Sequence, residues 1–276
     1  MRIFTLLVFL FLYIPVTVIV LFSFNEAANV SVLTGLSLKW YVKAFASPLA
    51  MNALTNSLTI ALCTAVISSL LGSAVALGLS GVSPRARMIV QAMFMIGLAI
   101  PGIVIGLASL VFFSAAISGS ESLVAFLNGW PKPVKLFSFG KPTVIAAHSL
   151  FCTALVVEIV LLRLRQVNRG WLEASADLYA TRGETLYRIV LPFIAPAMLV
   201  GALLSFVLSF DEFIIAFFVS GPNPTLPVYM FASVKRGITP ELNAIATTVL
   251  SMSVFVSVIV FLVVNQGLRR GTAAAA

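Results

Sequence analysis

Residues 173–192, EASADLYATRGETLYRIVLP, form the longest polar and amphipathic passage between two strongly apolar runs in the second half of the chain. Apolar residues recur at helical spacing up to Tyr179, which predicts a short first helix. Thr181 then stands three residues before Glu184, the spacing of a capping box at the start of a second helix. We predict a helix, a turn and a second helix that ends where Pro192 leads into the next apolar run.

The composition on either side of this passage is that of a membrane protein. Hydrophobic residues make up 61% of the chain and charged residues 9%, whereas charged residues make up about 25% of a soluble domain. Continuous apolar runs favour helices of about 20 residues over the alternating strands of a barrel. We predict an all-α protein with one transmembrane domain, residues 1–276, a loop at 165–194 and six spans: 3–24, 54–80, 88–116, 143–164, 195–219 and 244–264.

The basic residues indicate an orientation for these spans. The first run is longer than the apolar core of about 7–15 residues in a signal peptide, and no persuasive cleavage site follows Phe24, so we interpret it as a span. Placing both termini inside the cell puts most of the 17 Lys and Arg residues on the cytoplasmic side, where short loops carry an excess of positive charge. The 165–194 loop is then cytoplasmic.

Small residues and one proline indicate how the spans pack. Gly72 belongs to a series of small residues four positions apart in the second run, and Gly102 and Gly106 frame the sequence GIVIG in the third. Small side chains allow close approach between helices, so we predict helix contacts at these positions. Pro101 lies within the third run and predicts a kink.

The chain lacks the residues that several activities need. Cys63 and Cys152 fall inside predicted spans, and His148 is the only histidine. We therefore expect no disulfide and no metal site, and we expect an interhelical hydrogen bond from His148. No G-x-x-x-x-G-K-S/T sequence is present to hold ATP, and no catalytic constellation can be placed at one membrane depth, so we expect no enzyme. The net charge of +8 is divided among loops and does not indicate nucleic acid.

The polar passage resembles the EAA loop of permease subunits in binding-protein-dependent ABC importers, through Glu173-Ala174-Ser175 and the later Ile189, Leu191 and Pro192. In that family this loop forms a coupling helix that fits a cleft in the ATPase subunit. The resemblance implies coupling roles for residues across the passage: Glu173, Ala174, Ser175, Asp177, Tyr179, Gly183, Ile189, Leu191 and Pro192.

Two residues depart from the family pattern. Ser175 replaces the second alanine, and Tyr179 occupies the position where the family usually has glycine; Gly183, four residues later, does not restore the register. A left-handed turn residue other than glycine or asparagine is uncommon and strained.

Asp211 and Glu212 lie within the fifth apolar run, in LSFVLSFDEFIIAFF (204–218). A charge at the centre of a span costs about 2.5–3.5 kcal/mol on insertion scales, so such residues usually face a pathway or a partner. An acidic pathway favours a cationic solute, and because consecutive residues point about 100° apart we favour Asp211 for it. Alternatively, both acids hydrogen-bond to a partner helix. For Glu158 in the fourth span we expect a pair with Arg163 or Arg165.

The last hundred residues add a second resemblance. LSFVLSFDEF, FVSGP and LPVYMFASVKRGITPELNAIAT are similar to the spermidine/putrescine permeases among these importers. This implies the type I importer permease fold and inward movement of a polyamine by alternating access in a bacterial cytoplasmic (inner) membrane. It also implies a second homologous permease, an external solute-binding protein, and two ATPase subunits that hold ATP and Mg.

Other functions stay open at this point. One alternative is an importer for another small solute, such as a different cationic amine or an oxyanion. Another is a stand-alone channel or secondary transporter. If the protein is an importer, the external loops Ser118–Lys141 and Gly221–Glu241 would receive the solute-binding protein.

Overall fold

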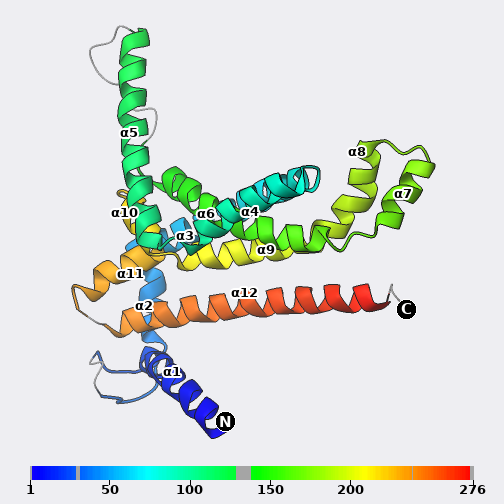
Figure 1. Ribbon diagram of the computed structural model, residues 1–276. Helices are drawn as coiled ribbons and strands as arrows, with labels where there is room; N and C mark the ends of the chain where they lie inside the picture. Colours follow the sequence, from blue (N-terminus) through cyan, green and yellow to red (C-terminus); the bar gives the residue numbers. More distant parts are fainter. Residues whose placement is uncertain (1, 29–31, 129–137, 238, 274–276) are drawn as a thin grey trace. The chain divides into compact units, whose positions relative to one another are not determined.

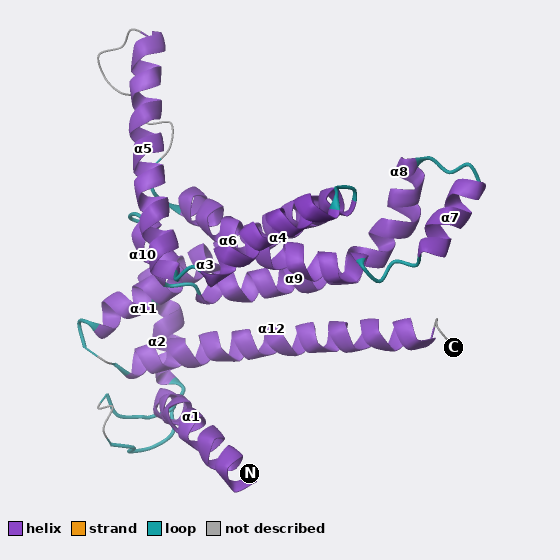
Figure 2. Cartoon of the chain, in the orientation of Figure 1, coloured by secondary structure: helices purple, strands orange, loops and turns teal. Residues whose placement is uncertain are grey.

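The computed structural model describes residues 2–28, 32–128, 138–237 and 239–273, and within these ranges the regular structure is helical apart from one isolated bridge between Asn25 and Leu36 (Figure 2). Six helical segments are long and apolar enough to cross a membrane, which confirms the predicted fold class. These segments are Phe4–Ser23, Pro48–Ser80, Gly102–Ser120, Lys141–Leu164, Arg182–Asp211 and Pro240–Leu262.

The chain divides into two compact units. The first comprises Met1–Asn56 and Pro224–Phe255, with α1 (Arg2–Ser23), α2 (Lys39–Ala46), α11 (Leu226–Val234) and the first parts of α3 (Pro48–Ser80) and α12 (Pro240–Ala273). Its α2 is fastened locally: the indole Nε1 of Trp40 donates to the Asn25 carbonyl at 2.7 Å, and Lys43 pairs with Glu241 at 3.4 Å. This unit also includes most of the predicted external loop at 221–241, which contains the helix α11.

The second unit comprises Ser57–Asn223 and Val256–Ala276 and contains both candidate functional regions. Its helices, labelled in Figure 1, are the rest of α3, α4 (Pro84–Ala99), α5 (Gly102–Asn128), α6 (Lys141–Leu164), α7 (Arg169–Asp177), α8 (Arg182–Thr185), the π-helical turn η1 (Leu186–Val190), α9 (Leu191–Asp211) and α10 (Ile214–Val219). In the other predicted external loop, residues 118–128 belong to α5, and residues 129–137 lie outside the described ranges.

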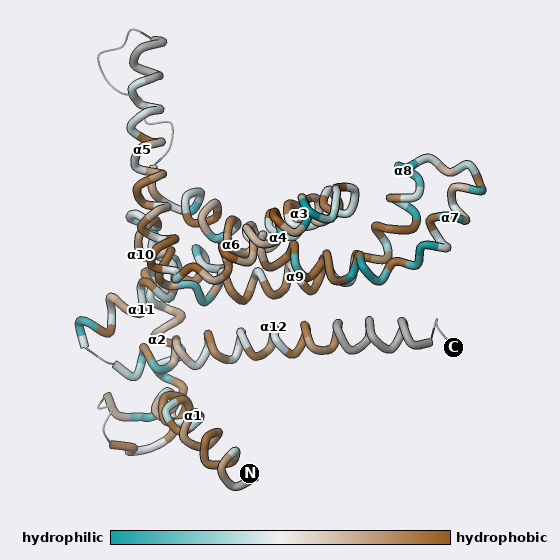
Figure 3. The backbone as a smooth tube through the Cα atoms, in the orientation of Figure 1, coloured by the Kyte–Doolittle hydropathy of each residue, from teal (hydrophilic) through white to brown (hydrophobic). Residues whose placement is uncertain are grey.

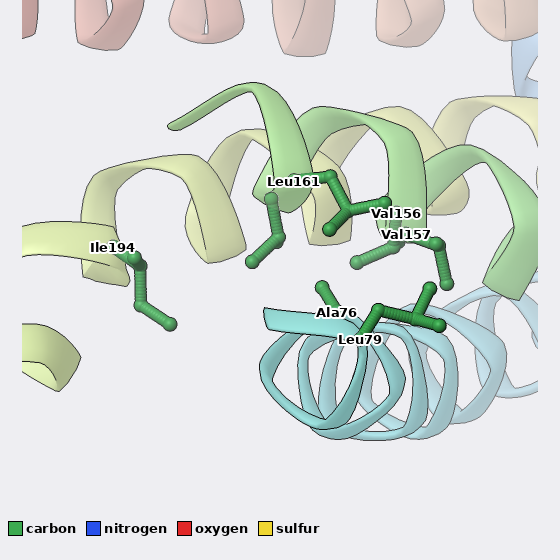
Figure 4. Packing of buried hydrophobic residues seen from close by; sticks show 7 residues of the cluster. Ala76, Leu79, Val156, Val157, Leu161 and Ile194 are labelled. Atoms are coloured by element: carbon green, nitrogen blue, oxygen red, sulfur yellow. The ribbon is translucent and has the colours of Figure 1, made fainter. Parts of the chain in front are cut away.

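The core of the second unit forms where α3, α6 and α9 meet. Aliphatic side chains from these helices make one buried cluster (Figure 4): Ala76, Leu79, Val156, Val157, Val160, Leu161 and Ile194. Val156 packs against two glycines, because a Cβ on Gly72 would lie 2.6 Å from the Val156 Cβ and one on Gly201 would lie 3.2 Å from its methyl groups. The predicted close approach at Gly72 is confirmed, and so is that at Gly106, where a Cβ would lie 2.7 Å from Phe218.

Two predicted spans are broken in the structure. The third run, predicted as 88–116, is divided between α4 and α5 at Ile100–Pro101, because a residue before proline is disfavoured in the α region and Ile100 is extended, with ψ 130°. The fifth run, predicted as 195–219, is divided between α9 and α10, where Glu212 is extended with ψ 114°. The prediction of two continuous spans was wrong, and Pro101 breaks the helix where we predicted a kink.

The boundary predicted at Pro192 was also wrong. Residues 182–211 run without a gap through α8, η1 and α9. Pro192 has no N–H to donate within the helix, and just before it the Leu191 N–H bonds to the Leu186 carbonyl, five residues back. The proline is therefore accommodated by a π-helical turn, and the helix continues into the fifth span.

Candidate functional site

The first candidate region is the α7–α8 loop, the polar segment that precedes the apolar α9 (Figure 3). The end of α7 has the hydrogen bonds of a Schellman motif. The Tyr179 N–H donates to the Ala176 carbonyl at 2.9 Å, and the Ala180 N–H donates to the Ser175 carbonyl at 3.0 Å. This motif places the residue after the helix in the left-handed conformation, usually a glycine.

Tyr179 occupies that left-handed position, with φ 57°. Among the residues that the structure describes it is the single non-glycine residue with positive φ. The conformation costs an L-residue about 1–2 kcal/mol, because its Cβ approaches a carbonyl oxygen. The turn geometry typical of glycine is thus kept although glycine is absent, and Gly183, where an added Cβ would meet nothing within 4 Å, does not replace it.

Two side-chain hydrogen-bond systems stabilise the α7–α8 loop, one between the two helices and one at the start of α8. The Ser175 and Thr185 hydroxyls lie 2.7 Å apart, and Ser175 is 7% exposed. Thr181 caps α8: its N–H donates to the Glu184 carboxylate at 2.9 Å, and its hydroxyl accepts from the Glu184 N–H at 3.3 Å. The predicted capping box is confirmed. Ser175 fastens the two helices with a hydroxyl that alanine lacks.

An aromatic contact ties this loop to α6 and α9. The Trp171 ring of α7 meets the Phe193 ring edge to face, with centroids 5.7 Å apart. The Arg163 guanidinium lies 4.0 Å from the Phe193 centroid, and its Nε donates to the Phe193 carbonyl at 3.2 Å. The loop therefore contacts the ends of two spans, α6 and α9. Sequence reasoning missed Phe193, although its place beside Pro192 is a signal.

The predicted coupling residues differ in exposure. Most lie on the outside of the loop and are available to a partner: Glu173, Ala174, Asp177, Tyr179, Gly183 and Pro192. Ser175 is buried between the helices, while Ile189 and Leu191 are half-buried. Leu191 packs against the aliphatic cluster of the core. The exposed residues could contact another protein, and the buried ones support the loop.

The second candidate region lies where the two helix breaks meet. A Cβ on Gly102, the first residue of α5, would lie 3.9 Å from Oε1 of Glu212. α5 and α10 then pack closely, as Figure 1 shows, with Gly106 against Ile214 and Phe218. Both breaks fall inside long apolar segments, where carbonyls at helix ends and an acidic side chain are polar groups that a cation can contact.

The two acidic residues at the second break have different surroundings. The carboxylate Oε1 of Glu212 accepts the Ile215 N–H at 3.0 Å, so this side chain caps the first turn of α10 and is half-buried. Asp211 ends α9 and is exposed. Glu212 therefore has a structural role that the sequence did not reveal, and Asp211 is the more accessible of the two.

Glu158 pairs differently from the prediction. Its Oε2 accepts from the Gln91 amide nitrogen at 2.7 Å, and the Gln91 amide oxygen accepts from Arg165 Nη2 at 3.1 Å. The direct pair with Arg163 or Arg165 was wrong, because Gln91 of α4 bridges the two charged groups. Gln91 is a polar residue within a predicted span, which is the signal that could have identified it.

His148 makes the interhelical hydrogen bond that we predicted. Its Nδ1 lies 2.8 Å from the Ser209 hydroxyl of α9, and the ring is 1% exposed. His148 of α6 thus contacts α9 at Ser209, three residues before the break at Glu212.

Spans broken beside acidic residues and an exposed helical loop tied to two spans define a multi-spanning subunit of a membrane transport system. Residues 68–270 match the family described as "Binding-protein-dependent transport system inner membrane component", and the chain belongs to that family.

Relatives and a solved structure agree with this assignment. The putrescine transport system permease protein PotI of Escherichia coli strain K12 is 39% identical over 252 residues, which cover 89% of this chain and 83% of that protein. The spermidine/putrescine transport system permease protein PotC of Haemophilus influenzae is 31% identical over 264 residues, 95% of each. The fold matches a chain from a bacterial ABC transporter that imports the acidic polysaccharide alginate, with TM-score 0.73, 18% identity and coverage of 96% and 92% of the two chains.

Proposed function

We propose that this chain is the permease subunit of an ATP-driven importer that moves a polyamine, such as putrescine or spermidine, inward across a bacterial cytoplasmic membrane. The observation that carries the proposal is the similarity to putrescine and spermidine/putrescine permeases along nearly the whole chain. The working complex would contain a second homologous permease, two ATPase subunits that bind ATP and Mg, and an external solute-binding protein. Both termini and the α7–α8 loop would face the cytoplasm, and this chain would catalyse no reaction itself.

The α7–α8 loop supports the coupling role in this proposal. It exposes Glu173, Ala174 and Asp177, and it is tied to α6 and α9 through Trp171 and Phe193. ATP binding by the partner subunits would move α7, and the aromatic contact would carry that motion to the spans. Access would then alternate between two states whose populations nucleotide shifts.

The test of coupling is Glu173→Arg in the complex reconstituted with its ATPase and binding protein. We expect polyamine-stimulated ATP hydrolysis to be abolished, with Glu173→Gln, which keeps the side-chain size, losing less. Size-exclusion chromatography establishes that the complex still assembles. Normal stimulation in the Arg variant would rule out the role of Glu173.

The test of the pathway compares the two acids at the helix break. Asp211→Asn removes a charge from an exposed side chain, and Glu212→Gln removes a charge while keeping an oxygen that can accept the Ile215 N–H. We expect Asp211→Asn to depress uptake more strongly, because a cation is attracted to the accessible carboxylate. Unchanged uptake of every polyamine tested would count against a path beside Asp211.

The broken spans alone also fit a stand-alone secondary transporter, in which discontinuous helices line the solute site. Purification from the native membrane separates the two functions, because an importer subunit brings an ATPase with it and a secondary transporter does not. Stimulation by a small solute other than polyamines, with the cognate binding protein present, would instead support an importer of different cargo.

A further inference from the structure

Two large side chains at the end of α7 lie almost wholly outside the packing of this chain. Tyr179 is 95% exposed and Leu178 is 81% exposed. We call these two residues the loop tip. Side chains of this size gain most of their interaction energy when they are buried, so the loop tip has more to gain from a partner than from its own chain.

Tyr179 combines this exposure with a strained backbone. Its φ of 57° lies in the left-handed region, where the absence of Cβ makes glycine the favoured residue. An exposed ring makes too little contact within the chain to offset the strain. Strained residues persist where the surrounding structure enforces them, and they cluster at functional sites.

The surrounding hydrogen bonds hold the backbone of Tyr179 in place. The Schellman bonds from Tyr179 and Ala180 fix the backbone at the turn, and the cap between Thr181 and Glu184 fixes the next residues. The turn therefore presents its side chain outward from a defined backbone. A contact group on a fixed backbone loses little backbone conformational entropy when it binds.

We propose that Tyr179 is the aromatic anchor that the loop inserts into an apolar pocket of the ATPase subunit. This rests on the proposed function, because it requires the α7–α8 loop to be the coupling segment. Glycine at this position would give the same turn without a side chain. The tyrosine adds a ring next to Leu178, so the matching surface on the ATPase is an apolar pocket with a polar group near the phenol oxygen.

The physical chemistry of tyrosine fits an anchor. The ring offers a large rigid contact area with two rotatable side-chain bonds, and tyrosine is enriched among the few interface residues that carry most of the binding energy. A hydroxyl at the far end of the ring can donate and accept, which adds discrimination between partners. The left-handed backbone strain is then offset by contacts that form in the complex.

The test compares replacements at one position that separate the ring from the backbone. Tyr179→Gly relaxes the left-handed turn but removes the ring, and Tyr179→Phe keeps the ring and the strain. The full chain is reconstituted in nanodiscs with its second permease, and binding of the co-purifying ATPase is titrated. We expect about a tenfold or greater rise in the dissociation constant for Tyr179→Gly and at most about a threefold rise for Tyr179→Phe. The thermal stability of the permease should be unchanged or raised in Tyr179→Gly.

Tyr187 provides a matched control within the same segment. It is 74% exposed but lies in η1, where the backbone is helical. We expect Tyr187→Ala to bind the ATPase about as tightly as the unaltered chain. An equal loss in this variant would show a general need for exposed aromatic residues and would overturn the assignment to Tyr179.

The remaining outcomes separate this inference from the proposed function. If Glu173→Arg abolishes stimulation while Tyr179→Gly keeps full affinity, the loop couples and Tyr179 is only a tolerated turn residue, so this inference alone fails. If the unaltered chain binds no ATPase, both fail.

Discussion

The three helices α3, α6 and α9 pack against one another through two different kinds of contact along their length. At the end nearest the α7–α8 loop they meet through the aliphatic cluster (Figure 4). Further along they meet through what we call the hydroxyl seam, a set of buried small polar residues with His148 among them: Thr64, Ser68, Ser69, Ser73, His148, Ser149, Thr153, Ser205 and Ser209. The two regions share their helices and differ in chemistry.

Three residues of the seam make side-chain hydrogen bonds between helices. The Ser68 hydroxyl donates to the Ser149 carbonyl at 3.3 Å, the Ser69 hydroxyl donates to the Met198 carbonyl at 3.0 Å, and His148 pairs with Ser209. In a bilayer the burial of apolar groups against other apolar groups gains little, because lipid tails are apolar too. Close packing at glycines and hydrogen bonds must then hold the helices together. The region of the aliphatic cluster relies chiefly on close packing at glycines, and the hydroxyl seam relies chiefly on hydrogen bonds.

The largest expected effect comes from adding a methyl group at the closest packing contact between two helices. Gly72→Ala places a Cβ 2.6 Å from the Val156 Cβ and 3.1 Å from the Thr153 carbonyl oxygen, so α3 must move away from α6. We expect a loss of about 3 kcal/mol or failure to fold. The measurement is the free energy of unfolding in mixed micelles. Gly78→Ala is the control, because its Cβ would meet nothing within 4 Å on the same helix.

The second prediction removes the other side of that contact. Val156→Ala leaves a cavity between Gly72 and Gly201 and should cost about 2 kcal/mol in the same assay, since neighbouring helices relax only partly. The double variant Gly72→Ala/Val156→Ala should be more stable than Gly72→Ala alone, because the added methyl fills the space that the valine left. Additive losses in this cycle would contradict direct contact between the two positions.

Local pattern predicted much of this arrangement. Run length predicted six spans but not the breaks in two of them. Four-residue spacing predicted the contact at Gly72, and the Thr181–Glu184 spacing predicted the cap of α8. These features depend on residues within one or two helical turns of each other. Such information is present in the sequence itself.

Features that depend on distant partners could not be predicted. The break at Glu212 falls at the acidic pair Asp211–Glu212 within an apolar run, but two polar residues do not by themselves predict that the helix ends there. The side chain of Glu212 accepts a backbone N–H of the next turn, which starts α10. Gln91 and Glu158 are 67 residues apart, and Ser175 and Thr185 are 10 apart on different helices. Only the packing of the helices brings these groups together.

The third prediction moves from packing to hydrogen bonds. Ser209→Ala removes the partner of His148 Nδ1, which lies 2.8 Å from the hydroxyl. Hydrogen bonds between membrane helices contribute about 0.6 kcal/mol on average and about 1.7 kcal/mol at most, so we expect a loss in that range. Double-mutant cycles with His148→Phe would isolate the pair. A loss as large as that of Gly72→Ala would remove the contrast between the two regions.

The smallest expected effect also comes from the seam. Ser205 is 0% exposed, and its hydroxyl finds no hydrogen-bond partner in the described part of the chain, while its carbonyl lies 3.8 Å from the Cys152 sulfur. Ser205→Ala keeps that carbonyl and removes a buried polar group without a partner, which should leave the free energy of unfolding unchanged or raise it by about 1 kcal/mol. Ser209→Ala is its matched comparison, since both replace a buried serine of α9. If both variants lose the same stability, the seam is held by the volume of its side chains, and its hydrogen bonds do not account for the difference from the aliphatic cluster.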